Sequence, residues 1–438
     1  MKLTNFQLIL VGGFVFLLLV GVVVFSGVLP IGKSGKTTAS GTVVLWGTLD
    51  SRDLGPLLHD FAIKNNTFTL TYVEKDPATY ANDLIEAFAS GSGPDMFFMP
   101  QDMIWRFGDK ALHIPFTSIP QRTFQDTYIS LASLYVDTDG FLALPFLVDP
   151  MVMYWNRDLY GNAGIVSPPK TWQDFETDVP LLTVKKDNIT LSQSALALGS
   201  FGNIAHAKDV ISLLLMQAGN PITFRSGSDL LVALGDPSSN AYIAAGTSAV
   251  SFYAAFSDPI KAVYSWNGGL PLDRDAFVGG TLATYFGYAS ELPAIRRQNP
   301  NLNFDVALVP QTAGSVARAT IGNITGIAIS KSSKNPYTAL TAASLLTGPD
   351  FLGTFLATSA ATFPVPPVRK DLLAVKPSDP YLSIFYTAAL GAKNWIDPSA
   401  PETTIIFHDM ISDAISNLLS VEASISKAGT RLNAVARK

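Results

Sequence analysis

The sequence contains no cysteine and only four histidines among its 438 residues. The absence of cysteine excludes disulfide bonds, thiol nucleophiles, thiolate metal sites and anchoring through a lipid-modified cysteine. The histidines, at positions 59, 113, 206 and 408, are widely spaced, and none falls in an HExxH metal-binding pattern. We therefore predict no metal site and no cofactor.

Charged residues are also scarce, at 15% of the chain, and the net charge is −5. An acidic balance gives nucleic acid no electrostatic attraction, so we predict no nucleic-acid partner. Apolar residues make up 48% of the sequence, which is enough to bury substantial cores. A chain of this length exceeds what one hydrophobic core usually serves, so we expect two or more domains.

One long apolar run is present near the N-terminus. Residues 8–25 are 18 apolar positions in succession, and the run extends to residues 6–29 with Gln7 and Ser26 as its polar interruptions. At 1.5 Å per residue the extended run spans roughly 36 Å, more than the ~30 Å of a bilayer core. We predict an N-terminal tip at residues 1–5, a transmembrane anchor or long signal at 6–29 and a flexible tether at 30–41.

From residue 42 onward the sequence alternates strand and helix patterns. Short apolar runs at residues 42–46, 68–73 and 96–99 predict three strands. The apolar residues at helical spacing between them are Leu54, Leu57, Leu58, Phe61 and Ala62, and then Tyr80, Leu84, Ile85 and Phe88 before Gly91. This alternation predicts a parallel α/β sheet. Ligands bind beyond the carboxyl ends of such strands, so we expect the turns after Trp46 and Met99 to face a cleft.

A different pattern occupies residues 140–176. Two apolar runs, residues 141–148 and 151–155, are joined by Asp149 and Pro150. Pro150 cannot donate to a sheet ladder and favours an extended Asp149, so we predict that one sheet does not continue straight through both runs. The chain is expected to change domain at this step.

Five segments, in order along the chain, resemble the extracellular solute-binding proteins of bacterial ABC importers, the maltose-binding-like family 1. The segments are ASGSGPD at residues 89–95, YWNRDL at 154–159 with PPKTW at 168–172, FVGGTLA at 277–283, IGNITGIAISK at 321–331 and PVPPVRKDL at 364–372. One such segment would carry little weight, but five in the order of the family make the resemblance specific. They cover the chain from about residue 42 to about residue 375.

The resemblance implies a two-lobed periplasmic-binding-protein-like fold of type II, α/β in class, with a mostly parallel sheet flanked by helices in each lobe. Carried onto this chain, the first lobe comprises residues 42–148 and 310–360, and the second lobe comprises residues 150–305 and 361–438. A further crossing between the lobes is expected near residues 362–364. The expected hinge residues are Leu147, Val148, Asp149, Pro150, Val309 and Pro310.

Ligand-binding residues of such a protein belong in the interlobe cleft, where polar groups orient a solute and aromatic faces cover its apolar surface. The predicted ligand-binding residues are Trp46, Thr48, Asp50, Asp102, Asp149, Tyr154, Trp266, Tyr288, Asn323 and Phe363. This mixture fits a sugar, and it also fits some peptides and amines. Most aromatic residues of the chain must lie in cores, so packing is the competing interpretation for each aromatic candidate.

The resemblance also implies a function. We expect a monomer at the cell membrane, tethered by its N-terminal helix, with both lobes outside the cytoplasm. It would capture a sugar or oligosaccharide by hinge closure and deliver this solute to ABC permease subunits with a cytoplasmic ATPase.

Two other functions stay open at this stage. One is a ligand-sensing or adhesive binding protein that is not coupled to transport. The other is an anchored glycoside hydrolase, which would need two acids flanking the scissile bond, such as Asp50 and Asp149. Nothing in the sequence selects that pair, and no nucleophile elbow is present, so we predict that the protein is not an enzyme.

Overall fold

The computed structural model describes residues 39–187, 189–315 and 318–437. The predicted anchor at residues 6–29 and most of the predicted tether lie outside the described residues. Within the described ranges, no helix is long and apolar enough to cross a membrane.

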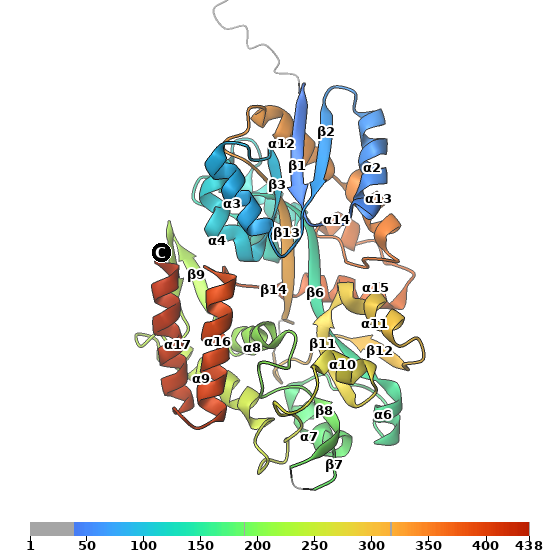
Figure 1. The fold of residues 1–438 in the computed structure, drawn as a ribbon, viewed down its shortest axis with the longest axis vertical. Coiled ribbons are helices and arrows are strands. Elements are labelled where there is room, and N and C mark those ends of the chain that lie inside the picture. The colour runs from blue at the N-terminus through green and yellow to red at the C-terminus, as the bar shows by residue number, and fades with distance from the viewer. Residues whose placement is uncertain (1–38, 188, 316–317, 438) are drawn as a thin grey trace, which may run out of the picture. The chain divides into compact units, whose positions relative to one another are not determined.

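The described residues from Gly41 onward are organised around one long sheet (Figure 1). Its strands follow the order β2 (Thr69–Glu74), β1 (Thr42–Gly47), β3 (Met96–Pro100), β13 (Thr320–Ile329), β6 (Leu144–Asn156), β11 (Leu282–Tyr288), β8 (Leu191–Leu196) and β7 (Val184–Lys185). Two further strands complete it: β12 (Phe304–Ala307) pairs with β6, and β14 (Ala392–Lys393) pairs with β13. The half from β2 to β13 belongs to a first lobe and the half from β11 to β7 to a second lobe.

The start of the first lobe confirms the predicted strand and helix alternation. Strands β2, β1 and β3 are parallel, and α2 (Ser51–Lys64) and α3 (Tyr80–Ser90) connect them. Helix α2 begins at an N-cap, Asp50, whose carboxylate accepts the backbone N–H of Arg52, and it buries the four predicted apolar residues up to Phe61. Ala62 is exposed, which corrects its predicted place on the buried face. Helix α3 ends at Gly91, whose φ of 72° makes the left-handed cap that glycine favours.

The remaining elements of the first lobe cover both faces of its half-sheet. They are η1 (Gln101–Met103), α4 (Ile104–Phe107), η2 (Gly108–Lys110), β4 (Ile114–Pro115), α5 (Gln121–Thr127), η3 (Ser130–Tyr135), β5 (Gly140–Phe141), α12 (Pro336–Leu346), α13 (Pro349–Ser359) and α14 (Lys370–Leu373).

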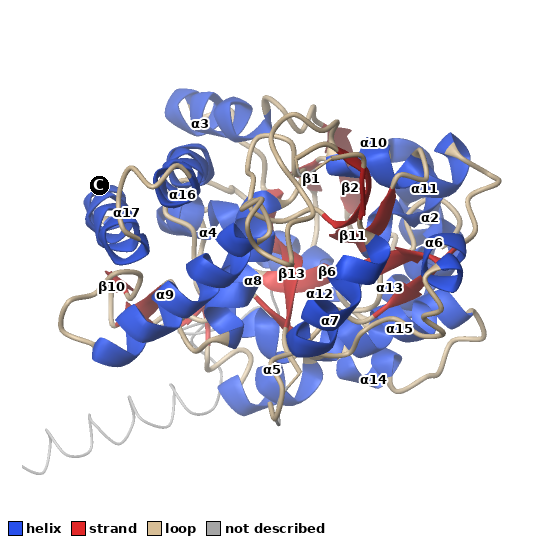
Figure 2. Ribbon diagram, turned by 90° about the horizontal axis from the view of Figure 1, so that it is seen from below, coloured by secondary structure: helices blue, strands red, loops and turns tan. Residues whose placement is uncertain are grey.

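Helices make up most of the remaining elements of the second lobe, and Figure 2 shows helices of the molecule around its strands. Its further elements are α6 (Arg157–Asn162), α7 (Trp172–Leu182), α8 (Ala207–Gln217), β9 (Thr223–Ser226), β10 (Asp229–Val232), α9 (Asn240–Ala255), α10 (Asp273–Val278), η4 (Ala289–Glu291), α11 (Leu292–Gln298), α15 (Pro380–Leu390), α16 (Ala400–Ile415) and α17 (Val421–Ala436).

Strand β6 overturns the prediction that the sheet would break at Pro150. Its 13 residues run through both lobes without interruption. The register explains why the proline is tolerated: β13 pairs with β6 as far as Pro150, and β11 pairs with it from Met151 onward. Pro150 therefore lies where β6 exchanges one partner for another, a position at which a missing backbone donor is least costly.

Backbone hydrogen bonds indicate where the chain makes its other two passages between the lobes. Gln311 is still held by the second lobe, because its N–H donates to the Lys170 carbonyl at 3.0 Å. The crossing is therefore made along β13, and Val309 and Pro310, both buried, lie on the second-lobe side. Val368, in turn, stays with the first lobe, since its carbonyl accepts the N–H of Ile129 at 3.1 Å. The return passage follows α14 and precedes α15.

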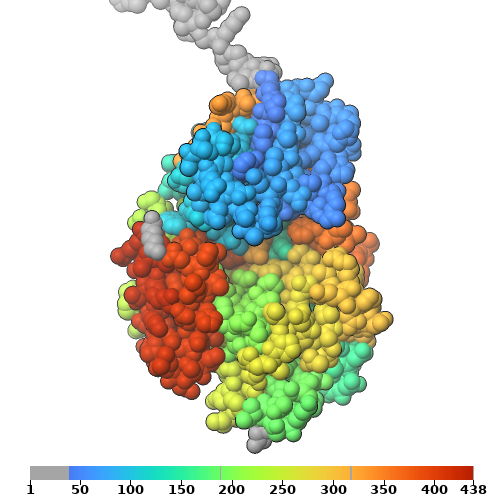
Figure 3. Space-filling view, viewed as in Figure 1, coloured from blue at the N-terminus to red at the C-terminus, as the bar shows by residue number. Residues whose placement is uncertain are grey.

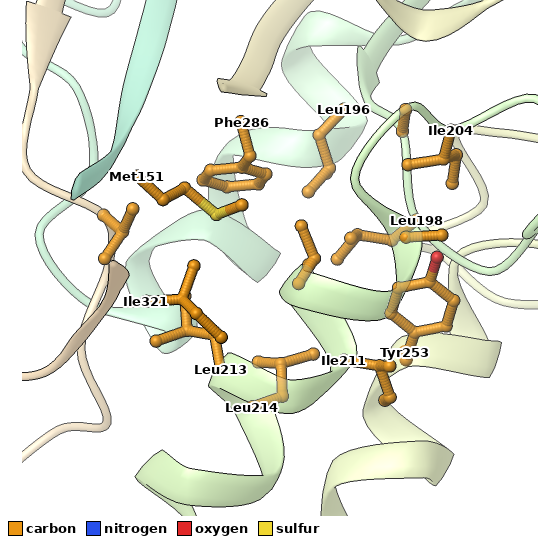
Figure 4. Packing of buried hydrophobic residues seen from close by; sticks show 14 of the residues in the cluster. Met151, Leu196, Leu198, Ile204, Ile211, Leu213, Leu214, Tyr253, Phe286 and Ile321 are labelled. Atoms are coloured by element: carbon orange, nitrogen blue, oxygen red, sulfur yellow. The ribbon is translucent and has the colours of Figure 1, made fainter. Parts of the chain in front are cut away.

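The second lobe contains a large continuous core (Figure 4). Side chains from β6, β8, β11, β13 and α8 meet there, including Met151, Leu196, Phe286, Ile321 and Ile211. Such close packing of apolar side chains is the dominant stabilising contribution in a domain of this kind.

Tyr154 lies in the same core and is fully buried. Its ring lies 6.0 Å from the Tyr285 ring and 6.1 Å from the Phe304 ring, measured between centroids. Its hydroxyl donates to the backbone carbonyl of Tyr288 at 2.7 Å, which joins β6 to the end of β11.

We predict that Tyr154→Phe lowers the free energy of unfolding by about 1–3 kcal/mol, because the buried Tyr288 carbonyl loses its donor. Urea unfolding followed by circular dichroism measures the change. Tyr337→Phe is the matched control, since Tyr337 is 50% exposed on α12. Equal stabilities of the two variants would contradict the prediction.

Candidate functional site

The hinge sheet has two distinct faces, and one of them is polar. Asp149 on β6 is paired with Asn323 on β13, so both side chains leave the same face. Val148 and Gly322 are their neighbours in sequence and belong to the opposite face. In Figure 3, the first-lobe atoms in blue meet the second-lobe atoms along a seam across the middle of the molecule. We call the polar groups around Asp149 and Asn323 the interlobe site.

A chain of hydrogen bonds links the two lobes at this site. The amide of Gln101, just beyond the carboxyl end of β3, donates to Asn323 Oδ1 at 2.9 Å and accepts the N–H of Ile324 at 3.1 Å. The hydroxyl of Tyr288, at the end of β11, lies 3.4 Å from the same Asn323 oxygen and donates to Asp209 Oδ2 at 2.8 Å. Side chains from β13, from the ends of β3 and β11, and from α8 therefore converge at one place.

Asp149 is the carboxylate on the floor of the interlobe site. Its Oδ1 accepts the N–H of Ser290 at 3.1 Å. Burial raises the pKa of Asp149 to about 7, and the nearby charge of Glu291 adds to that rise, while the Ser290 hydrogen bond and His206 oppose it. Among the described residues Asp149 forms no ion pair, so its charge is poorly compensated near neutral pH.

His206 and Glu291 form a charged pair beside Asp149. The Nε2 of His206 lies 2.8 Å from Glu291 Oε1, and its Nδ1 lies 3.9 Å from Asp209 Oδ2. Burial alone would lower the pKa of His206, but the hydrogen bond and charge of Glu291 raise it. Burial likewise opposes ionisation of Glu291, and His206 overcomes it and lowers the Glu291 pKa. The pair is therefore held in its charged form.

A second ionic group lies at the start of α8, within the second lobe. Lys208 Nζ bonds the carboxylate of Asp397 and, at 2.7 Å, the hydroxyl of Thr403. Asp102, from the first lobe, has an exposed side chain, and yet desolvation by the surrounding protein raises its pKa, followed by the charge of Asp397.

The structure brings together four of the ten predicted ligand-binding residues. Asp149, Tyr288 and Asn323 are connected by the β6–β13 pairing and the hydrogen bonds above, and Asp102 follows Gln101 directly. Their assignment to a ligand site stays a prediction.

Four further candidates lie apart from this group. Trp46 and Thr48 are half-buried at and beyond the end of β1, where the ammonium of Lys75 lies 3.8 Å from the centroid of the Trp46 ring. Asp50 caps α2 and pairs with the exposed Arg52, whose hydrogen bonds lower the Asp50 pKa to about 2. Phe363 is half-buried in the loop after α13.

The prediction that Tyr154 and Trp266 offer stacking faces to a solute is wrong, because both rings lie in the core of the second lobe. Tyr154 is 0% exposed and Trp266 is 1% exposed. The Trp266 indole N–H donates to Asn203 Oδ1 at 3.2 Å, so its polar edge is satisfied internally. Neither ring has a surface that a solute could reach in this structure.

Sequence reasoning missed the contribution of the second lobe from α8 and η4. His206, Lys208 and Asp209 lie at the start of α8, which follows β8, and Glu291 ends η4 after β11. The available signal was their place beyond the carboxyl ends of two strands. Over the described residues, no group of three or more acidic or histidine side chains is arranged to hold a metal ion.

The raised pKa of Asp149 predicts a pH dependence of stability. A folded-state pKa of about 7, against 3.8 for the ordinary carboxyl, means that the folded state binds the proton more tightly. This contribution to stability is full below about pH 4 and is lost as the pH rises through about 7. We expect Asp149→Asn, which resembles the neutral acid, to gain stability relative to the parent protein over that range, as measured by urea unfolding.

Asp236→Asn provides a control of opposite sign. Hydrogen bonds from Ser238 lower the pKa of Asp236, so its contribution is lost only as the pH falls through the acid range. Between about pH 5 and 8 the difference between this variant and the parent should stay constant. If the Asp149→Asn difference is also constant there, the pKa assigned to Asp149 is wrong.

Several known proteins are similar to this chain in sequence or in fold. The maltotriose-binding protein of Pyrococcus abyssi (strain GE5 / Orsay) is 23% identical over 141 residues, which span 31% of this chain and 30% of that protein. A solved structure of cyclo/maltodextrin-binding protein complexed with maltotetraose superposes with a TM-score of 0.71 at 15% identity, covering 90% of this chain and 96% of that one. The cyclic α-maltosyl-1,6-maltose binding protein from Arthrobacter globiformis gives 0.73 at 16% identity, covering 90% and 99%.

These structural likenesses confirm the predicted two-lobed α/β solute-binding fold. The sequence pattern of the family described as bacterial extracellular solute-binding protein matches residues 57–382, which include most of both lobes. This is a family of binding proteins and not of enzymes, and it agrees with the resemblance carried by the five sequence segments. The chain belongs to the bacterial extracellular solute-binding proteins.

Proposed function

We propose that this chain captures a carbohydrate at the interlobe site. The observation that carries the proposal is the chain of hydrogen bonds from Gln101 through Asn323 and Tyr288 to Asp209, with Asp149 beside it. Amide, phenol and carboxylate groups in one place offer both donors and acceptors, as the hydroxyl groups of a sugar require. Relatives named for maltotriose and maltotetraose support the same solute class.

In this proposal each lobe contributes part of the site. Asp149 and Asn323 would meet sugar hydroxyls from the hinge floor, Tyr288 and Asp209 from the second lobe, and Asp102 from the first. Trp46, Thr48, Asp50 and Phe363 remain proposed contacts at the rim, where an aromatic ring could cover an apolar sugar face.

Capture would proceed by closure of the two lobes. An open form binds the sugar against one lobe, and rotation about the strands that join the lobes then buries it. Leu147, Val148, Asp149 and Pro150 of β6 are the proposed hinge residues, together with the crossing part of β13. Because β6 is one continuous strand, we expect small dihedral changes spread over several residues and not a single flexible joint.

The proposed partners follow from the family. The closed form would deliver its sugar to the permease subunits of an ABC importer with a cytoplasmic ATPase. The lobes would work outside the cytoplasm, and residues 6–29 would tether them to the cell membrane. A sensing or adhesive role that uses the same site without transport is the alternative.

We predict that Asp149→Asn weakens binding of maltotriose about 10- to 100-fold, because a hydrogen bond to a charged group contributes roughly 1.5–3 kcal/mol. Isothermal titration calorimetry at pH 8, where Asp149 is ionised, measures the loss. Asp258→Asn is the matched control, since Asp258 accepts the N–H of Ile260 in an exposed loop remote from this site. Unchanged affinity in Asp149→Asn would remove that residue from the site.

We further predict that saturating maltotriose reduces the radius of gyration measured by small-angle scattering and raises the midpoint of thermal unfolding. A rise without compaction would contradict closure. A panel of mannotriose, a polyamine and a short peptide tests the solute class under the same conditions. Stabilisation by the polyamine or the peptide alone would refute the carbohydrate proposal.

A further inference from the structure

The end of the first lobe that lies away from the interlobe site combines a cavity with several cationic side chains. Strand β1 begins at this end, at the top of Figure 1. Strand β13 reaches it at Ile329, which pairs with Met96 at the start of β3 and lies about 20 Å along the strand from Asn323. We call this the entry end of the lobe, made of residues 41–44, 65–69, 91–96 and 330–335.

Hydrogen bonds fix the place where the chain enters the lobe. Asn335 Nδ2 donates to the Thr42 carbonyl at 3.2 Å. The carboxylate of Asp95 accepts the N–H of Val44 at 3.0 Å and the hydroxyl of Ser333 at 2.5 Å. The loop 330–335 therefore lies directly beside the start of β1.

A cavity of about 370 Å³ opens next to this loop. Its apolar wall is made by Ile85 and Phe88 of α3 and by Phe107 of α4. Phe107 is buried and Phe88 is half-buried, whereas Ile85 is 39% exposed. A wall of this kind can cover the apolar atoms of a ligand that enters from solvent.

Cations line the same cavity. Arg106, Lys110 and Lys331 contribute to its lining, and the one carboxylate found there, that of Asp109, pairs with Lys110 at 2.6 Å. Arg106 and Lys331 are exposed, and neither takes part in an ion pair among the residues that the structure describes. Lys334 is exposed further along the loop. The charge balance at the cavity is therefore positive, although the chain as a whole carries −5.

The sequence that precedes the entry end indicates which anion these cations meet. Residues 6–29 are proposed to cross the membrane, and the 12 residues 30–41 to tether the lobes to it. A segment of that length reaches about 40 Å when fully extended, so the entry end stays near the lipid headgroups. Such a tether raises the effective concentration of the membrane surface to the order of millimolar, and a weak contact is then populated.

We propose that the cavity at the entry end binds the headgroup of an anionic phospholipid such as phosphatidylglycerol. The phosphodiester binds Arg106 and Lys331, and the glycerol and the first acyl carbons lie against Phe88 and Ile85. The lobes then stand on the membrane by their entry end, which keeps the interlobe site clear of the headgroups. This inference rests on the proposed membrane tether and not on the identity of the solute.

Energy transfer tests the inference on the full chain, because the absence of cysteine allows single labels. A fluorophore is attached at Asn66→Cys, in the exposed turn between α2 and β2, or at Glu422→Cys, exposed at the start of α17. The labelled chains are placed in nanodiscs of phosphatidylcholine, alone or mixed with phosphatidylglycerol, with an acceptor on a lipid headgroup. We expect phosphatidylglycerol to raise the transfer from position 66 and not from position 422.

Two double variants and one soluble compound control the experiment. Arg106→Gln with Lys331→Gln should abolish the rise, because both cations that face the phosphate are lost. Arg297→Gln with Lys261→Gln removes the same charges from exposed positions of the second lobe and should keep the rise. Free glycerol phosphate, which lacks the acyl chains and the tethered surface, should not raise the midpoint of thermal unfolding.

Equal transfer in the two lipid compositions would overturn the proposal, as would a rise that persists without Arg106 and Lys331. Stabilisation by glycerol phosphate with no lipid effect would also overturn it, and would assign the cavity to a soluble phosphate ester.

Failure of the tether gives a different result. A chain that separates from phosphatidylcholine nanodiscs on gel filtration would count against the proposed anchor at residues 6–29. Retention of that chain by phosphatidylglycerol nanodiscs, dependent on Arg106 and Lys331, would still support the headgroup site. Retention by neither kind of nanodisc would overturn the site together with the anchor.

Discussion

Backbone pairing along β6 is the constraint on which the rest of the structure depends. Strand β6 pairs with β13 in the first lobe and with β11 and β12 in the second lobe. Neither half of the sheet is therefore complete without β6. A strand that is hydrogen-bonded in two sheets cannot act as a loose linker. Strands β6 and β13 therefore connect the lobes through paired backbone.

The two faces of that hinge carry opposite kinds of groups. The face with Asp149 and Asn323 gathers ionisable and amide side chains, and burial raises the pKa of Asp149 to about 7. Poorly compensated polar groups cost stability, and they are retained where a ligand or a moving partner supplies what is missing. The opposite face carries Gly322 against Ala392 and Leu131, with the ion pair of Arg225 and Asp137 at its edge.

Pro150 and Tyr154 illustrate where reasoning from local sequence fails. Proline was expected to interrupt a sheet, and it does remove a donor, but it lies at the residue where β6 changes partners. Tyr154 was expected in the cleft because aromatic residues serve sugars well. It is instead enclosed by Tyr285, Phe277 and Phe304, and its hydroxyl donates a hydrogen bond to the Tyr288 carbonyl. Register and packing decide both cases, and neither is encoded within a few residues of the position itself.

The sequence by itself determined the α/β class, the helix and strand order at the start of the first lobe and the family. These features follow from apolar periodicity, capping residues and short ordered motifs, all of which act over fewer than about 20 residues. The rule that ligands bind beyond the carboxyl ends of parallel strands pointed to the turn after β3, where Gln101 and Asp102 lie.

Only the tertiary structure decided that His206, Asp209 and Glu291 complete the interlobe site, that the second crossing is β13, and that Arg225 meets Asp137 behind the hinge. Arg225 and Asp137 lie 88 positions apart in the chain, and Tyr288 and Asp209 lie 79 apart. Such contacts depend on how the lobes pack, because burial and charge act through space and not along the sequence.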